Sequence, residues 1–262
     1  MPSTDRRSLL HMTSFRHSLG STVSLLWGLR IRPQRDRSQV LMYHSIGGSA
    51  EGDTRDLYSI SPSAFSNQIE ILRERSDAGE LEIVPFGSER PGTISITFDD
   101  GYLDNLSVAA PVLAECGIPF HVFLCPTLIE SGRSGFLSRT DVLELATMSG
   151  VSLGVHGYSH TPLTTLDTDS ARSELFGSRK WLEDLIQLPV TSMSYPHGAL
   201  NSDVVKLVRE VGFTCAACSK FGPIDPQSSP LALPRVDVWS SDTNSSFAAK
   251  LDGKWDWMKW RT

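Results

Sequence analysis

Short apolar segments alternate with helical patterns from residue 39 to residue 239. Eight segments of apolar and β-branched residues predict strands at 40–43, 81–84, 93–98, 120–125, 151–155, 190–195, 213–218 and 233–239. Between them, apolar residues at three- and four-residue steps predict helices, including ones over 103–116 and 167–187 and ones begun by Ser61-Pro62 and Asn201. This alternation is typical of βαβ units and a mainly parallel sheet, and seven or eight units favour a barrel over an open sheet.

Amphipathic segments flank this region at both ends of the chain. Residues 1–37 form a basic arm with a helical pattern, for which three interpretations stay open: a helix on the domain or a frayed terminus, an interfacial membrane helix, or an organellar transit segment. Residues 38–262 are expected to form one barrel domain that ends in an amphipathic helix over 247–258. Its tryptophans are expected to pack on the domain, with sugar stacking or a membrane interface as the alternative.

The composition and charge of the chain are those of an ordinary globular protein. The chain has 262 residues, of which 40% are hydrophobic and 21% charged, as in ordinary globular proteins. Its net charge of −6 argues against nonspecific nucleic-acid binding. Seven Arg against two Asp give the arm +5, so the other residues carry −11. With no evident export signal or membrane span, we expect a cytoplasmic protein, and contact of the arm with a membrane surface is one of its three interpretations.

The four cysteines are expected to be reduced core residues. They are Cys116, Cys125, Cys215 and Cys218. The last two form one Cys-x-x-Cys pair, and a zinc site of that type needs two more ligands at a second close spacing, which the chain lacks. A redox dithiol at this pair is the alternative.

Two adjacent carboxylates, Asp99 and Asp100, follow the strand predicted over 93–98. Neighbours on a strand point to opposite faces, but a turn at Gly101 would let both carboxylates reach one pocket. Because two unpaired carboxylates repel, a cation between them is physically plausible. The alternative is an Asp that caps the following helix beside a solvated neighbour.

Two histidines, His156 and His160, follow the strand over 151–155. Imidazoles four residues apart on a helical turn face the same side and are able to share one ion. Together with a carboxylate they would leave coordination positions for water and substrate. The sequence therefore predicts a metal site.

Three segments, Thr97–Tyr102, Val155–His160 and Ser194–Gly198, resemble in this order the motifs of the polysaccharide deacetylase family (NodB-homology, carbohydrate esterase 4-like). The resemblance spans about residues 39–239. It implies an α/β fold, a distorted (β/α)7 barrel, and a divalent metal held by an Asp-His-His triad. The metal would be Zn2+, with Co2+, Ni2+ and Mn2+ as alternatives.

The resemblance also implies roles for individual residues. Asp100, His156 and His160 match the metal ligands, and Asp99 matches the general base that activates water at the metal. The backbone N–H of His197 matches an oxyanion donor. Three further residues are expected to contact the substrate, namely Tyr102, Tyr195 and Pro196.

The chain departs from the family pattern at several positions. Ser194 stands where many members have an Arg, so Arg235 is the candidate for holding Asp99 ionised, with a surface ion pair as its alternative. Gly157 replaces a Ser or Thr, which puts one supporting hydrogen bond in doubt. No histidine follows His197, so the general acid is assigned to His44, as in members with a rearranged strand order, and His197 is the rival.

These expectations define one leading function and two alternatives. The leading function is a metal-dependent hydrolase that removes N-acetyl, or in second place O-acetyl, groups from a glycan or glycan precursor. The alternatives are an amidohydrolase acting on a small amide that is not a sugar and a degenerate family member that binds glycans.

Overall fold

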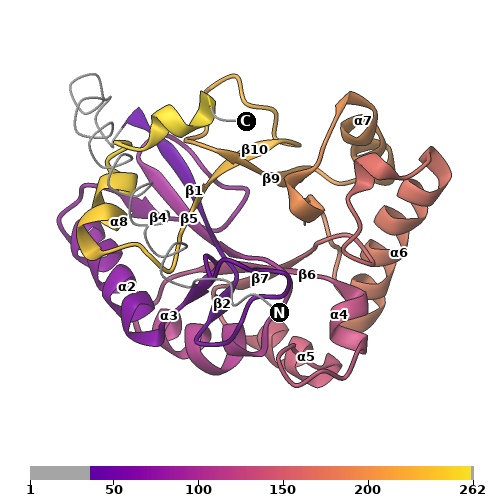
Figure 1. Ribbon diagram of the computed structural model, residues 1–262, viewed down its shortest axis with the longest axis horizontal. Helices are drawn as coiled ribbons and strands as arrows, with labels where there is room; N and C mark the ends of the chain where they lie inside the picture. Colours follow the sequence, from indigo (N-terminus) through magenta and orange to yellow (C-terminus); the bar gives the residue numbers. More distant parts are fainter. Residues whose placement is uncertain (1–35, 261–262) are drawn as a thin grey trace, which may run out of the picture.

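The computed structural model describes residues 36–260, and within them seven parallel strands close into a barrel (Figure 1). Around the barrel, each strand pairs with the next in chain order, and β1 closes the ring by pairing with both β5 and β10. The strands are β1 (Ser38–Tyr43), β5 (Thr93–Phe98), β6 (Phe120–Leu124), β7 (Val151–Val155), β8 (Ser192–Ser194), β9 (Cys215–Phe221) and β10 (Leu233–Asp237). The basic arm expected over residues 1–37 lies almost entirely outside the described residues.

The barrel is distorted in three places. Strand β4 (Glu82–Ile83) pairs with the first half of β5, so β6 reaches β5 only at Thr97 and Phe98. Strand β8 has only three residues, and the register between β9 and β10 shifts between Leu233 and Arg235. A separate pair of two-residue strands, β2 (Ser45–Ile46) and β3 (Ser59–Ile60), was not predicted by the sequence pattern.

Helices lie outside the strands, as Figure 1 shows. The longer ones begin and end where the sequence indicates: the side chains of Ser61, Asp167 and Asn201 accept N-terminal N–H groups, and Gly212 ends α7 in the left-handed region. The helices are α2 (Pro62–Asp77), α3 (Ala110–Glu115), α4 (Pro126–Glu130), α5 (Arg139–Thr147), α6 (Thr168–Ile186), α7 (Ser202–Val211) and α8 (Asn244–Leu251). In the described part of the chain, no helix is long and apolar enough to cross a membrane.

Two predicted helices differ in detail from the observed ones. The segment expected as one helix over 103–116 starts as a π-helical turn, η3 (Asn105–Ala109), before α3 begins. The C-terminal pattern divides into α8 and a 3-10 turn, η6 (Asp256–Trp260), because the chain turns between them at Gly253 with φ +75°.

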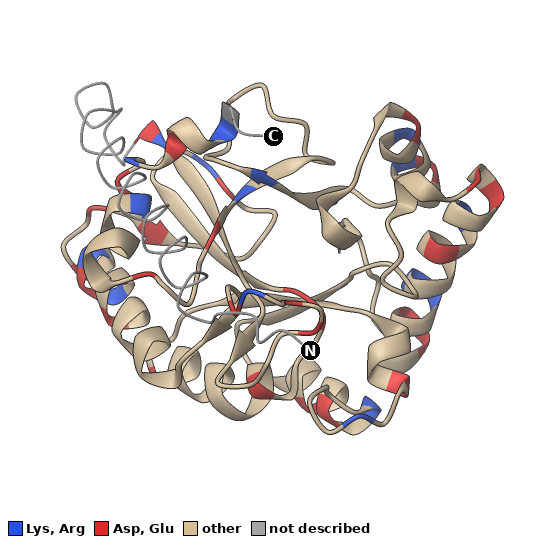
Figure 2. Ribbon diagram, viewed as in Figure 1, with Lys and Arg blue, Asp and Glu red and all other residues tan. Residues whose placement is uncertain are grey.

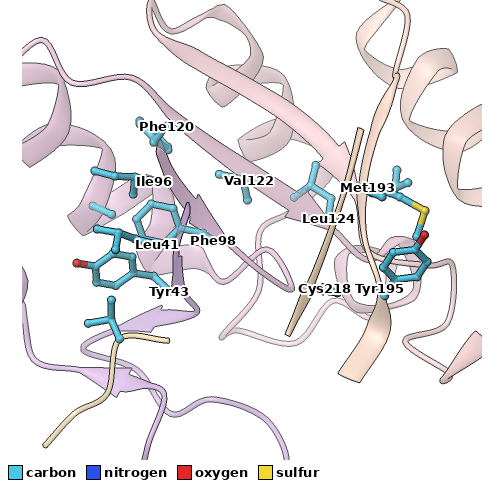
Figure 3. Packing of buried hydrophobic residues seen from close by; sticks show 14 of the residues in the cluster. Leu41, Tyr43, Ile96, Phe98, Phe120, Val122, Leu124, Met193, Tyr195 and Cys218 are labelled. Carbon is cyan, nitrogen blue, oxygen red and sulfur yellow. The ribbon is translucent and has the colours of Figure 1, made fainter. Parts of the chain in front are cut away.

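The hydrophobic core lies between the strands and the helices (Figure 3). Tyr43 of β1 and Phe98 of β5 stack with ring centroids 5.5 Å apart, and both rings pack on Phe65 of α2. Since neighbours on a strand alternate, Thr97 and Asp99 point into the barrel. Charged residues otherwise gather on the outward helices (Figure 2), so the charged groups inside the barrel stand out.

All four cysteines are free thiols. Cys125 and Cys218 are buried, whereas Cys116 and Cys215 are half-buried, so only two of the four are core residues. Burial raises the pKa of each thiol, and that of Cys215 reaches about 12. Raised pKa values are the opposite of what a reactive dithiol at residues 215–218 requires.

Candidate metal-dependent active site

The carboxylates of Asp99 and Asp100 both reach the same end of the barrel, at the carboxyl end of β5. Asp100 has φ +74° and Gly101 has φ +80°, so the strand alternation ends at Asp100, one residue before the turn that the sequence predicts. A side chain at Gly101 would meet Leu124 at 2.8 Å, which is why glycine fits there. Both carboxylates are almost fully buried.

Three ligand-type side chains converge beside Asp99. The Nε2 atoms of His156 and His160 lie 3.5 Å and 3.2 Å from Asp100 Oδ1, and one donor atom from each residue falls within 4.8 Å of the others. His156 Nδ1 lies 3.0 Å from the Ser194 carbonyl and donates to it in the tautomer that leaves Nε2 free as a ligand. One carboxylate and two imidazoles are a donor set that suits zinc, so these residues fit a divalent metal.

The segment between the two histidines is a loop. The sequence predicted a helical turn here, and this is wrong: Gly157 and His160 have φ +68° and +63°, in the left-handed region. The two imidazoles nevertheless lie side by side, with ring centroids 5.0 Å apart. The reversals of the loop backbone therefore bring the two imidazoles together, as the helical turn was expected to do.

Arg235 lies inside the barrel, against Asp99. Its side chain is fully buried, and Nη1 and Nη2 donate to the two oxygens of Asp99 at 2.7 Å each. Nη2 also donates to Ser194 Oγ at 2.8 Å, and Nε donates to the Cys218 carbonyl at 3.0 Å. The surface ion pair considered as its alternative is therefore excluded. Arg235 is the third residue of β10, so it reaches the site from within the strand.

These charges determine the protonation of the carboxylates and imidazoles. Burial alone would raise the pKa of Asp99, but the charge and hydrogen bonds of Arg235, together with the neighbouring histidines, outweigh it and lower that pKa to about 2. Burial lowers the pKa of His156 to about 4. Burial also acts to lower the pKa of His160, yet the hydrogen bond and charge of Asp100, with smaller contributions from Asp99 and Glu51, outweigh it and the pKa is raised.

His44 lies at the end of β1, half-buried, with its ring centroid 4.5 Å from that of Tyr58. The carboxylates of Asp99, Asp100 and Asp237 all lie near its imidazole. Asp237, at the end of β10, was not singled out from the sequence. Among the described residues, His44 Nδ1 and Asp237 Oδ1 are both buried without a hydrogen-bond partner.

The third motif places one histidine at the surface. His197 is exposed, has φ +56°, and its ring centroid lies 4.5 Å from that of His160. Tyr195 is instead fully buried, and its hydroxyl donates to the Leu231 carbonyl. It follows inward-pointing Ser194, so it points outward into the core and offers no side chain to a substrate.

Tyr102 and Pro196 are also buried. The Tyr102 ring stacks on Phe136, with centroids 4.9 Å apart, and its hydroxyl accepts a hydrogen bond from the Glu51 N–H at 2.6 Å. Pro196 packs against the loop at Gly157, where an added Cβ would lie 2.8 Å from Pro196 Cγ. Both side chains are thus packed inside the protein, and their contact with a substrate stays a prediction.

Comparisons with known proteins point to one family. A family model described as polysaccharide deacetylase matches residues 87–216. The chain is 27% identical over 217 residues to YxkH of Bacillus subtilis (strain 168), a polysaccharide deacetylase by name, covering 81% of this chain and 75% of that protein. It is 24% identical over 213 residues to a poly-β-1,6-N-acetyl-D-glucosamine N-deacetylase of Staphylococcus aureus (strain N315), covering 75% of this chain and 73% of that protein.

Solved structures share the fold. The deacetylase PplD of Streptococcus pyogenes, solved in complex with acetate, superposes with a TM-score of 0.71 at 19% identity, covering 82% of this chain and 98% of that chain. IcaB from Ammonifex degensii gives a TM-score of 0.70 at 22% identity, covering 85% and 98%. At these identities the likeness supports the distorted seven-stranded barrel and nothing finer.

Proposed function

The chain belongs to the polysaccharide deacetylase family, and on this premise we propose that it is a metal-dependent hydrolase that removes N-acetyl groups from a glycan or glycan precursor. One observation carries the proposal: the Asp100, His156 and His160 cluster lies beside a buried, ionised Asp99. A metal-ligand set and a separate carboxylate at one end of a barrel are what hydrolysis of an amide at a metal requires.

The metal belongs at the cluster of Asp100, His156 and His160. A divalent cation bound there would polarise the acetyl carbonyl and make a nearby water more acidic. The Ser194 carbonyl orients the imidazole of His156, and this outer contact keeps the ligating nitrogen turned toward Asp100. Zinc is the proposed ion because it is commonly bound by histidine nitrogen and carboxylate oxygen together.

Asp99 is the proposed general base. Its Oδ2 lies 3.9 Å from His156 Nε2, so the carboxylate faces the cluster, while paired hydrogen bonds from Arg235 hold its orientation. The lowered pKa keeps it ionised at neutral pH and ready to accept a proton from water. Arg235 touches no substrate in this scheme and is a positioning residue.

His44 is the proposed general acid, which protonates the leaving amine. It approaches the site from the end of β1, and Asp237 at the end of β10 lies near its ring. Asn105 donates to the His44 carbonyl at 2.8 Å and so fixes the backbone that carries this ring. The backbone N–H of His197 is proposed as a donor to the developing oxyanion.

Acetate release tests the proposed function. Purified protein with zinc should release acetate from N-acetylglucosamine oligomers, and chelation should abolish the release. The β-1,6-linked polymer is the first substrate to try, since the Staphylococcus aureus relative is named for it. Asp99→Asn is the matched control, because it removes the base and leaves the three metal ligands. A zinc-loaded protein that is inert on every acetylated sugar, or an Asp99→Asn variant as active as wild type, would contradict the proposal.

A further inference from the structure

The loop between His156 and His160 lacks the internal hydrogen bonds that a helical turn would supply. Its backbone reverses twice, at Gly157 and at His160, both with positive φ. A histidine in the left-handed region persists where surrounding contacts hold it. The position of His160 therefore depends on groups outside the loop.

The carboxylate of Glu174, in α6, accepts two backbone N–H groups of this loop. Glu174 Oε2 accepts the backbone N–H of Tyr158 at 2.8 Å and that of Ser159 at 2.9 Å. Both bonds end on the same carboxylate oxygen, and hydrogen bonds to carboxylates are stronger than those to neutral acceptors. The Tyr158 ring also packs over Gly177 of α6, where an added Cβ would lie 3.3 Å from the ring.

Thr127, in α4, donates hydrogen bonds to a backbone carbonyl of the same loop. The Thr127 backbone N–H and hydroxyl both donate to the Tyr158 carbonyl, at 3.0 Å and 2.7 Å. The middle of the loop is thus fixed on its donor side by α6 and on its acceptor side by α4. Two helices on either side of one peptide leave the loop little freedom to rotate.

Because position 157 is a glycine, the loop has no side-chain hydrogen bond from this position and depends on another residue, Glu174. A Cβ at Gly157 would lie 2.8 Å from Pro196 Cγ, and φ there is +68°, so a serine or threonine would be strained at this position. A side-chain hydrogen bond from position 157 is therefore not available to stabilise the loop. The same hypothetical Cβ lies only 3.6 Å from Glu174 Oε2, so the carboxylate is next to the point where that bond is missing.

We propose that Glu174 is a positioning residue that holds the loop so that His160 faces the same point as Asp100 and His156. The inference rests on the proposed function, because that function gives the loop a metal to bind. His156 is oriented separately, by the Ser194 carbonyl and by its backbone N–H bonded to the Leu124 carbonyl. Loss of the Glu174 contacts therefore acts mainly on His160.

Zinc affinity of the full chain tests the inference, measured by competition with a chromophoric chelator. Glu174→Ala should weaken zinc binding by roughly 10- to 100-fold, as loss of outer contacts to metal ligands commonly does. Glu174→Gln should cost less, because its amide oxygen remains as a neutral acceptor. In zinc-free protein, the amide hydrogens of Tyr158 and Ser159 should exchange faster in both variants, which a general loss of stability would not confine to two residues.

Asp169→Asn is the matched control, since it makes the same change of charge on the same helix. It should leave the zinc affinity within about twofold of wild type. An equal loss in this control would assign the effect to long-range charge and overturn the inference. If Glu174→Ala does not fold, Glu174→Gln decides. Unchanged affinity and exchange in Glu174→Gln would then overturn the inference alone, whereas a wild-type protein that binds no zinc would overturn the proposed metal dependence as well.

Discussion

Replacing Arg235 with lysine measures how far Asp99 depends on its buried partner. Arg235 is fully buried and donates to both oxygens of Asp99, to the Ser194 hydroxyl and to the Cys218 carbonyl. Lysine keeps the charge but is a single compact donor that does not span two carboxylate oxygens. The substitution therefore removes the paired geometry and leaves the net charge of the site unchanged.

The structure sets the size of the effect. Lysine retains about one contact with Asp99 and loses the second, and the Cys218 carbonyl is left without its donor from Arg235. Hydrogen bonds that involve a charged group contribute about 1.5–3 kcal/mol each, so we expect a loss of about 3 kcal/mol in the free energy of unfolding. Arg235→Met, which also leaves Asp99 without a countercharge, should cost about 3–5 kcal/mol. Urea unfolding with an unchanged m-value measures both.

A double-mutant cycle on acetate release separates orientation of the base from general damage. If Arg235 acts through Asp99, Arg235→Lys should lower kcat by roughly 100-fold in the wild-type background. It should have little further effect in an Asp99→Asn background, because the base is already absent. Losses that add fully in the double variant would refute the reasoning, and so would an Arg235→Lys enzyme with wild-type stability and kcat.

Other predictions address the acid, the metal, the barrel interior and α8. His44→Ala should lower kcat by roughly 10²–10⁴-fold with metal content unchanged; an effect of that kind in His197→Ala alone would reassign the acid. Removing zinc should lower the free energy of unfolding by about 2.7 kcal/mol relative to zinc at one hundred times its Kd, which calorimetry measures. Burial lowers the pKa of His121 to about 3, with a further lowering by Arg235 and an opposing effect of Asp99. Below about pH 6.5, His121 therefore binds a proton in the unfolded chain but not in the folded protein. Stability should thus fall with decreasing pH by up to about 1.4 kcal/mol per unit, and urea midpoints for His121→Asn should show a shallower slope; equal slopes would contradict this. Lys250→Met should cost about 3–5 kcal/mol in urea unfolding, because Lys250 is fully buried against Asp242; a variant as stable as wild type would show that this pair is dispensable.

The sequence predicts the site residues best where polar motifs directly follow predicted strands. Asp99 and Asp100 follow β5, and the segment from His156 to His160 follows β7. Consecutive parallel strands end on the same rim of a barrel, so motifs that are distant in sequence meet there. This rule brings Asp100, His156 and His160 to one rim, whereas the exact position of His160 also depends on the backbone reversals of its loop.

Residues that reach the site from strand interiors or from helices were harder to predict. The contact of Arg235 depends on barrel closure and on the register shift beside it, which periodicity does not contain. Asp237 has no motif around it, and its place near His44 follows from the pairing of β1 with β10. Glu174 is an ordinary helical glutamate in sequence, and its role requires knowing that α6 packs beside the metal loop.

The position of Tyr195 follows a rule that can be applied to the sequence, namely that neighbouring residues of a strand point to opposite faces. Ser194 points inward, where its hydroxyl contacts Asp99 and Arg235, so its neighbour points outward into the core. Placing Tyr195 at a strand end was correct, but proximity to the rim does not place a side chain in the site. Strand parity is the signal that would have separated the two residues.

The alternation of side chains along each strand separates residues that stabilise the fold from residues that form the site. The outward faces carry Tyr43 and Phe98, which pack under α2, while the inward faces carry Thr97, Asp99 and Arg235. The inward side chains include charged and hydroxyl groups beside apolar ones such as Phe123, so the interior supplies less hydrophobic stabilisation than the outer layer between strands and helices. Substitutions in the outer layer should therefore change unfolding with little effect on the chemistry. The interior is different, because each buried charge there depends on its hydrogen-bonded partners, and a single substitution affects both stability and the site.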